Sequence, residues 1–222
     1  MAAYFTPEFT TFFKDLSKNN NSVWFNENKA RYEKDVKIPF TALVQDIISK
    51  SQKLDPSIQI EPKEAITRLN RDIRFSKDKS LYKMHVSAII SPKGKKEKEY
   101  PGMYIELSPE RIAIYGGAYQ LEKEALYKVR NTIAKNLDEF KKILANKTFV
   151  NLFGELQGDK NKVLPPEFKA LLDQQPLIAN KNFYYMAELS PKELTSPTLL
   201  DIMMAHFKAG KPVSDFLAKA MQ

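Results

Sequence analysis

Apolar residues at helical spacing occupy the beginning of the chain. Thr6-Pro7-Glu8 has the form of a helix start, with Thr6 as the predicted N-cap and Pro7 at the first helical position. The large apolar residues that follow recur three or four positions apart and predict one buried helix face: Phe9, Phe12, Phe13 and Leu16. The asparagine-rich segment at residues 18–21 predicts the end of this helix.

A second helical pattern is longer and contains a proline. Ser22 is its predicted N-cap, and apolar residues continue at helical spacing as far as Ile48. Because proline lacks the backbone N–H and clashes with the preceding turn, Pro39 predicts a kink or a division of this stretch. The sequence therefore predicts a helical region over residues 6–53.

Short runs rich in β-branched and aromatic residues follow, and they predict strands at residues 66–75, 84–90, 102–107 and 112–115. The turn residues at 108–111 separate two of these runs and predict a β-hairpin. We expect antiparallel pairing, because no helix long enough for a parallel crossover lies between the runs. Gly116 and Gly117 predict the end of the sheet.

Helical periodicity returns over residues 121–146, and Ser190-Pro191 and Ser196-Pro197 each have the form of a helix start. The residues after Gly210-Lys211-Pro212 predict a separate final helical turn. The expected fold is α+β, a single domain over residues 1–222. Its antiparallel sheet, from residues 61–119, is expected to be covered by helices from residues 6–53 and 121–222.

The composition restricts the chemistry. The 222 residues include no cysteine and two histidines, which excludes a disulfide framework, a thiol nucleophile and any cysteine-ligated metal site. His85 and His206 are far apart and show no metal-ligand spacing, so no metal site is predicted, although the carboxylates leave a Mg²⁺ site open. We find no common catalytic fingerprint and predict no cofactor.

No apolar run approaches the roughly 20 residues of a membrane-spanning helix, and the first ten residues lack the form of a secretory signal. We expect a soluble, cytoplasmic protein without a membrane partner. The sequence does not indicate the oligomeric state.

The positive charge is concentrated in one segment. The formal net charge is +8, and residues 68–99 contain ten basic and four acidic side chains, a net charge of +6. Three of the six arginines in the chain lie there: Arg68, Arg71 and Arg74. Arginine binds phosphate or carboxylate through two parallel hydrogen bonds, so this segment is the candidate site for an anion.

An extended conformation over residues 68–75 would place alternate side chains on opposite sides. Leu69, Ile73 and Phe75 are expected in the core, which leaves the side with Arg68 and Arg74 at a surface or cleft. Arg71 falls on the apolar side, and it therefore requires either a bulge or a partner carboxylate.

The run from Arg68 to His85, with Arg71-Asp72 and Ser76-Lys77-Asp78-Lys79 at its centre, resembles the signature of the bacterial family catalogued as domain of unknown function 2461. Weaker matches extend along nearly the whole chain, including Trp24-Phe25, Gly116-Gly117 and Val129-Arg130. The resemblance implies an intact domain of bacterial type in which the central run is important, and it implies no activity.

Three functions are consistent with this run. The favoured hypothesis is a module that binds a phosphate-bearing small molecule, a nucleic acid or another anion through six basic side chains: Arg68, Arg71, Arg74, Lys77, Lys79 and Lys83. The second is an enzyme on a phosphorylated or carboxylate substrate, with four weak candidates for acid–base catalysis: Asp72, Asp78, Tyr82 and His85. In the third, the run is an internal salt-bridge network, and the protein binds another protein elsewhere.

Overall fold

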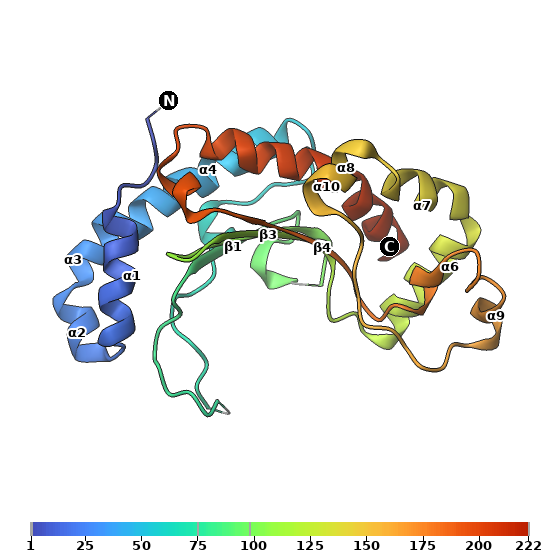
Figure 1. Cartoon of the computed structure of the whole chain (residues 1–222), viewed down its shortest axis with the longest axis horizontal. Helices are drawn as coiled ribbons and strands as arrows, with labels where there is room; N and C mark the ends of the chain where they lie inside the picture. The colour runs from blue at the N-terminus through green and yellow to red at the C-terminus, as the bar shows by residue number, and fades with distance from the viewer. Residues whose placement is uncertain (1, 75, 98, 222) are drawn as a thin grey trace. The chain divides into compact units, whose positions relative to one another are not determined.

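The computed structural model describes residues 2–74, 76–97 and 99–221 (Figure 1). The fold is α+β, as the sequence predicts, with helices at both ends of the chain and a four-stranded antiparallel sheet. Two compact units can be distinguished. One comprises Met1–Lys96, Tyr104–Ile114 and Glu188–Met204, and the other comprises Glu97–Met103, Tyr115–Ala187 and Ala205–Gln222. The single domain over residues 1–222 stays a prediction.

The N-terminal region is helical, as predicted, and contains α1 (Glu8–Lys18), α2 (Ser22–Glu27), α3 (Lys29–Tyr32) and α4 (Ile38–Gln52). The predicted apolar face of α1 is confirmed, since all four of its large apolar residues are buried. Both predicted caps are wrong by one residue. Pro7, not Thr6, occupies the N-cap position of α1, and Asn21, not Ser22, caps α2 by accepting a hydrogen bond from the N–H of Trp24 at 3.0 Å. Asparagine and serine cap helices about equally well, so the sequence alone could not choose between neighbours.

The division predicted at Pro39 is confirmed and takes the form of a π-helical turn. This turn, η1 (Glu33–Lys37), joins α3 to α4, and the N–H of Ile38 bonds to the carbonyl of Glu33, five residues earlier. Pro39 is the second residue of α4, directly after this turn. The backbone therefore remains helical on both sides of the proline.

The sheet contains β1 (Val86–Ile90), β2 (Gly102–Leu107), β3 (Ile112–Ala118) and β4 (Phe183–Leu189), in the order β1-β2-β3-β4. The hairpin predicted at residues 108–111 is confirmed. The N–H of Ser108 bonds to the carbonyl of Arg111 at 3.0 Å, and the Ser108 hydroxyl accepts from the N–H groups of Glu110 and Arg111. The short elements α5 (Pro62–Ala65) and η2 (Gly94–Lys96) lie on either side of β1 in the sequence.

Two predictions about strands are wrong. The predicted strand at 66–75 is not present over its described residues, 66–74, where isolated bridges join Ile66 to Ala88 and Asn70 to Tyr82. Conversely, β4 lies in the region that the sequence assigned to helices, 121–222. Its alternation of buried Phe183, Tyr185 and Ala187 with less buried neighbours is the period-two signal of a strand, but the run is isolated between helical segments.

The two glycines predicted to end the sheet lie inside β3. An added Cβ at Gly116 would lie 2.3 Å from the ring of Tyr185, so the absence of a side chain makes room for that ring. Gly117 has a φ of 96°, which other residues rarely adopt. The glycines therefore mark a place where β3 admits a neighbouring side chain.

The C-terminal helices are α6 (Lys123–Lys135), α7 (Leu137–Leu144), α8 (Lys147–Phe153), α9 (Pro166–Lys169) and α10 (Leu199–Met221), with the 3-10 turns η3 (Pro176–Ala179) and η4 (Pro191–Thr195). The predicted separate turn after Pro212 is wrong, because α10 continues through this proline. Helices from both ends pack on the sheet: α4 contacts β1, and the Tyr185 hydroxyl of β4 donates to the Gly210 carbonyl of α10 at 3.0 Å.

Candidate anion-binding arm

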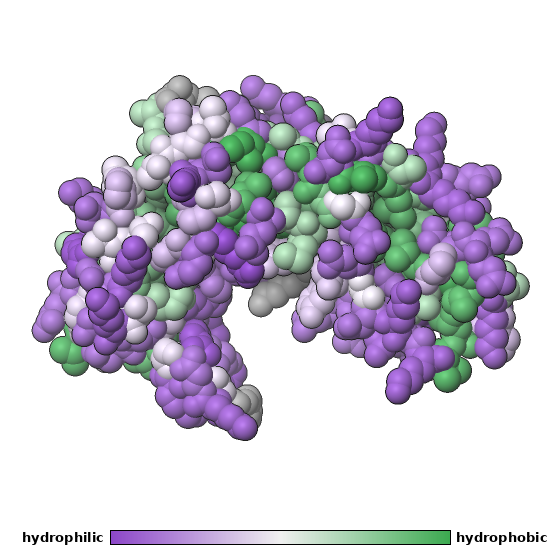
Figure 2. Space-filling view, in the orientation of Figure 1, coloured by the Kyte–Doolittle hydropathy of each residue, from purple (hydrophilic) through white to green (hydrophobic). Residues whose placement is uncertain are grey.

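Residues 66–85, which we call the arm, connect α5 to β1 and extend beyond the sheet (Figure 1). The two legs of the arm pair in an antiparallel manner without forming a regular strand. The N–H of Arg71 bonds to the carbonyl of Leu81 at 2.8 Å, and the N–H of Lys83 bonds to the carbonyl of Leu69 at 2.9 Å. The arm is therefore an irregular hairpin, whose surface is mainly hydrophilic (Figure 2).

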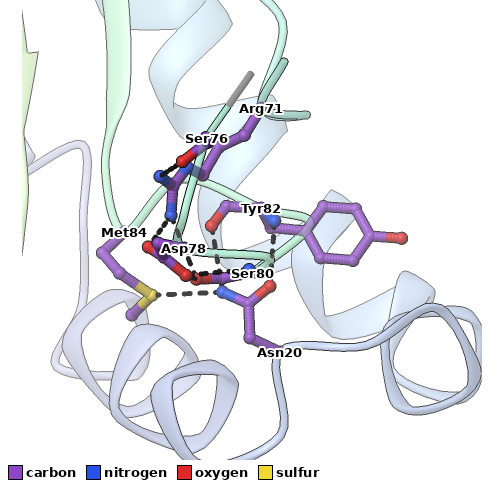
Figure 3. A network of polar contacts seen from close by, with 7 residues as sticks. All are labelled: Asn20, Arg71, Ser76, Asp78, Ser80, Tyr82 and Met84. Atoms are coloured by element: carbon purple, nitrogen blue, oxygen red, sulfur yellow. Dashed lines mark hydrogen bonds and ion pairs between the residues drawn. The ribbon is translucent and has the colours of Figure 1, made fainter. Parts of the chain in front are cut away.

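Asn20, in the linker between α1 and α2, fixes the arm near its base. The Asn20 side chain accepts from the N–H of Tyr82 and donates to the carbonyl of Tyr82, both at 2.9 Å (Figure 3). The Tyr82 ring stacks on Phe25, with centroids 4.1 Å apart. An asparagine amide has the same donor and acceptor as a peptide group, so Asn20 pairs with the arm as a neighbouring strand would.

Arg71 lies between the two legs of the arm and is paired inside it. Its guanidinium bonds to the Asp78 carboxylate and to the Ser80 hydroxyl, the latter at 3.0 Å (Figure 3). Asp78 also accepts from the N–H of Ser80 at 2.9 Å. The hydrogen bond from Arg71, followed by those from Ser80, holds the pKa of Asp78 well below its usual range. The sequence required either a bulge or a partner carboxylate at Arg71, and the structure shows the partner carboxylate, that of Asp78.

Arg74 forms a second pair within the arm. Its Nε and Nη2 donate to the two carboxylate oxygens of Asp72 at 3.0 and 2.7 Å, the fork geometry that arginine favours. These hydrogen bonds from Arg74 lower the pKa of Asp72. Arg68 lies farther from the same carboxylate, at 4.0 Å, and its side chain is 70% exposed. Arg74 is 77% exposed despite its pair.

The three lysines of the arm differ in their surroundings. Lys77 is exposed, and Lys79 is exposed and donates to the carbonyl of Ile73 at 3.1 Å. Lys83 is half-buried at the base, with its Nζ 3.4 Å from the Thr67 hydroxyl. The arm thus presents cations along its length. It does not gather the six predicted anion-binding side chains, three arginines and three lysines, around one point.

The predicted core positions of the arm are confirmed in part. Leu69 is buried at 8% exposure. Ile73 is half-exposed, so its predicted place in the core is wrong; the legs at this point have no sheet to pack on. Phe75, also predicted in the core, lies outside the described residues.

His85 belongs to a different cluster from the arm's arginines. Its Nε2 lies 3.4 Å from Glu106 of β2, and Glu106 also accepts from the Tyr104 hydroxyl at 3.2 Å. Arg111 lies 3.7 Å from Glu106 and pairs with Glu188 at 2.8 Å. Burial lowers the pKa of His85 more than Glu106 raises it.

The four catalytic candidates therefore do not form a constellation. Asp72 and Asp78 are paired with arginines and ionise at low pH, which makes them poor proton donors. The Tyr82 ring packs on Phe25, and His85 pairs with Glu106. Among the described residues, no group of three or more histidine or carboxylate side chains could hold a metal ion. In the same part of the chain, no helix is long and apolar enough to cross a membrane.

Sequence reasoning missed Asn20, the residue that fixes the arm. It lies in a run of three asparagines, which indicates a helix end and nothing about a partner 62 residues away. The pairing of Arg74 with Asp72, by contrast, agrees with the internal salt-bridge network that the sequence left open as an alternative.

Comparison with protein families gives a match over nearly the whole chain. A family model described as conserved hypothetical protein (DUF2461) matches residues 8–216, which include every strand and the complete arm. A search of curated proteins found no significant match. The extent of the family match, together with the signature at residues 68–85, shows that the chain belongs to the DUF2461 family.

Proposed function

We propose that the arm binds a phosphate-bearing polyanion, with nucleic acid as the ligand class. The observation that supports this most directly is the position of the exposed cations. Arg68 and Lys77 are exposed on an extended hairpin, and the paired Arg74 is 77% exposed beside them. A row of cations matches repeating phosphates better than it matches one small anion, which needs donors directed at a single point.

In this proposal Arg71 and Asp78 stabilise the arm, and the exposed cations contact the ligand. The Arg71 side chain is 29% exposed and bonds to Asp78 and Ser80, so its fork is occupied within the arm. The internal-network hypothesis thus accounts for Arg71, while the remaining cations support ligand binding. An enzyme at the same place is less well supported, because the acid–base candidates are dispersed.

The test is fluorescence anisotropy of short labelled DNA and RNA duplexes over a range of salt concentrations. Each lost phosphate contact should reduce the slope of log K against log salt by about 0.9. The double variant Arg68→Gln/Lys77→Gln should therefore lower the slope by about 2 and weaken binding equally for all sequences.

The matched control is Lys141→Gln/Lys142→Gln, which removes the same charge from two exposed lysines of α7. In this control, the slope of log K against log salt should equal that of the unaltered protein within experimental error. Equal losses in the two double variants, or no binding of either duplex at low salt, would refute the proposed role of the arm.

A further inference from the structure

The base of the arm is joined to a cluster of aromatic rings on the N-terminal helices. The Tyr82 ring, which points away from Arg71 and Asp78 in Figure 3, stacks on Phe25 with an interplanar angle of 16°. Phe25 in turn meets Phe12 of α1 edge to face, with ring centroids 6.4 Å apart. The arm and these rings therefore form one connected structure.

Trp24 extends this cluster towards solvent. Its ring centroid lies 5.7 Å from that of Phe12, which is fully buried, whereas Trp24 itself is half-buried. The preceding residue, Val23, is 67% exposed. Helix α2 has no fully buried side chain, although three of its six residues are large and apolar. Aromatic surface is thus accessible at Trp24, one residue from the ring that contacts the arm.

Positive charge lies at the same end of the arm. An isolated bridge pairs Tyr82 with Asn70 of the other leg, and the N–H of Lys83 bonds to the carbonyl of Leu69 at 2.9 Å. The residue before Leu69 is Arg68, whose side chain is 70% exposed. The base of the arm therefore combines an exposed guanidinium with the aromatic cluster of α1 and α2.

Cations beside accessible aromatic rings suit a nucleic acid whose bases are unpaired. The cations bind the phosphates of any nucleic acid, single-stranded or double-stranded. An aromatic side chain, however, stacks only on a base whose face is uncovered, and in a duplex the neighbouring base pairs cover both faces. Such stacking accepts every base, because each base has a π-face. The rings at the base of the arm therefore favour a single strand over a duplex.

We propose that the ligand of the arm is single-stranded nucleic acid, and that one unpaired base stacks on Trp24 while Arg68 contacts a nearby phosphate. This inference rests on the proposed function, the binding of nucleic acid by the arm, and it specifies the ligand. Phe25 and Tyr82 are positioning residues here, because their stack holds the arm against α2. A single strand should bind more tightly than a duplex of the same length.

The first test uses the fluorescence of Trp24, the only tryptophan of the chain. A base that stacks on an indole quenches its emission, so an oligothymidylate of about 12 nucleotides should lower the emission of the complete chain. A duplex of the same length and inorganic phosphate should each leave the emission nearly unchanged. Unchanged emission at saturating oligothymidylate, or equal quenching by the duplex, would overturn the proposal.

The second test replaces the ring. Trp24→Leu should weaken the binding of labelled oligothymidylate about tenfold, the effect of losing one stacked base. The slope of log K against log salt should not change, because stacking releases no counterions. Trp24→Phe retains a smaller ring and should keep part of the affinity. If Trp24→Leu does not fold, Trp24→Phe and the quenching of the unaltered protein still decide the question, and unaltered affinity in a folded Trp24→Leu variant would refute the stacking.

The matched control is Tyr119→Leu, which removes another accessible ring from a position outside the arm and α2. Tyr119 is 53% exposed and follows the last residue of β3. The variant should bind oligothymidylate as tightly as the unaltered protein does. A loss equal to that of Trp24→Leu would contradict the assignment to Trp24.

The outcomes separate this inference from the proposed function. Arg68→Gln/Lys77→Gln should reduce the salt slope for oligothymidylate by about 2, and saturating oligothymidylate should still quench Trp24. Salt-dependent binding through the arm with no quenching and no preference for single strands would leave the proposed function intact and refute stacking on Trp24. No binding of either single strands or duplexes at low salt would refute both.

Discussion

Removal of the Asn20 side chain should release the base of the arm. Asn20→Ala deletes two hydrogen bonds of 2.9 Å to the backbone of Tyr82. Each such bond contributes about 1 kcal/mol net, so the free energy of unfolding should fall by about 2 kcal/mol. Both hydrogen bonds are part-buried, so the loss should stay below the full cost of two unpaired, fully buried groups.

The assay combines urea denaturation with hydrogen exchange of the arm. The amide of Tyr82 bonds directly to Asn20, so its exchange should accelerate most, and those of Arg71 and Lys83 should follow as the legs separate. The stacking of Tyr82 on Phe25 remains in the variant and should keep the arm attached.

The control for this prediction is Asn26→Ala, because Asn26 is an exposed asparagine of α2. It should change the stability by no more than about 0.5 kcal/mol. If Asn20→Ala were as mild as this control and the Tyr82 amide exchanged at its original rate, the reasoning about the arm's anchor would be refuted.

Two further predictions concern the sheet and its histidine. Gly116→Ala should lower the free energy of unfolding by about 1–3 kcal/mol, because the new Cβ would lie 2.3 Å from the Tyr185 ring; an unchanged urea midpoint would contradict this packing. Burial lowers the pKa of His85 in the folded state, so the unfolded chain binds more protons and stability should decrease as the pH falls below about 6.5. Urea titrations at several pH values should show a shallower decrease in His85→Gln, and an identical decrease would argue against burial of this imidazole.

The fold class was predictable because local patterns report it directly. The apolar face of α1 and the limits of β2 follow from side chains a few positions apart, and the turn at Ser108 is closed by hydrogen bonds within four residues. The family was also recognisable from the run at residues 68–85. These features depend on periodicity and local hydrogen bonding, which the order of residues contains.

The predictions that failed involve residues whose partners are distant in sequence or whose backbone departs from regular geometry. Residues 66–75 have the composition of a strand, but over the described part of this stretch, 66–74, isolated bridges replace a ladder. The run that forms β4 has the alternation of a strand, yet its place in the sheet depends on β3, more than 60 residues earlier. A strand is stable only when a neighbour supplies its hydrogen bonds, and the position of that neighbour is a tertiary property.

The sequence by itself determined an α+β fold and a positive charge concentrated at residues 68–99. Only the tertiary structure decided which of those cations are paired: Arg71 meets Asp78, while Arg68 remains largely exposed. It also brought Asn20 to Tyr82 and buried Arg130 with no carboxylate partner among the described residues. The reason is that composition fixes how many charges and donors a chain has, whereas the path of the backbone fixes which of them find partners.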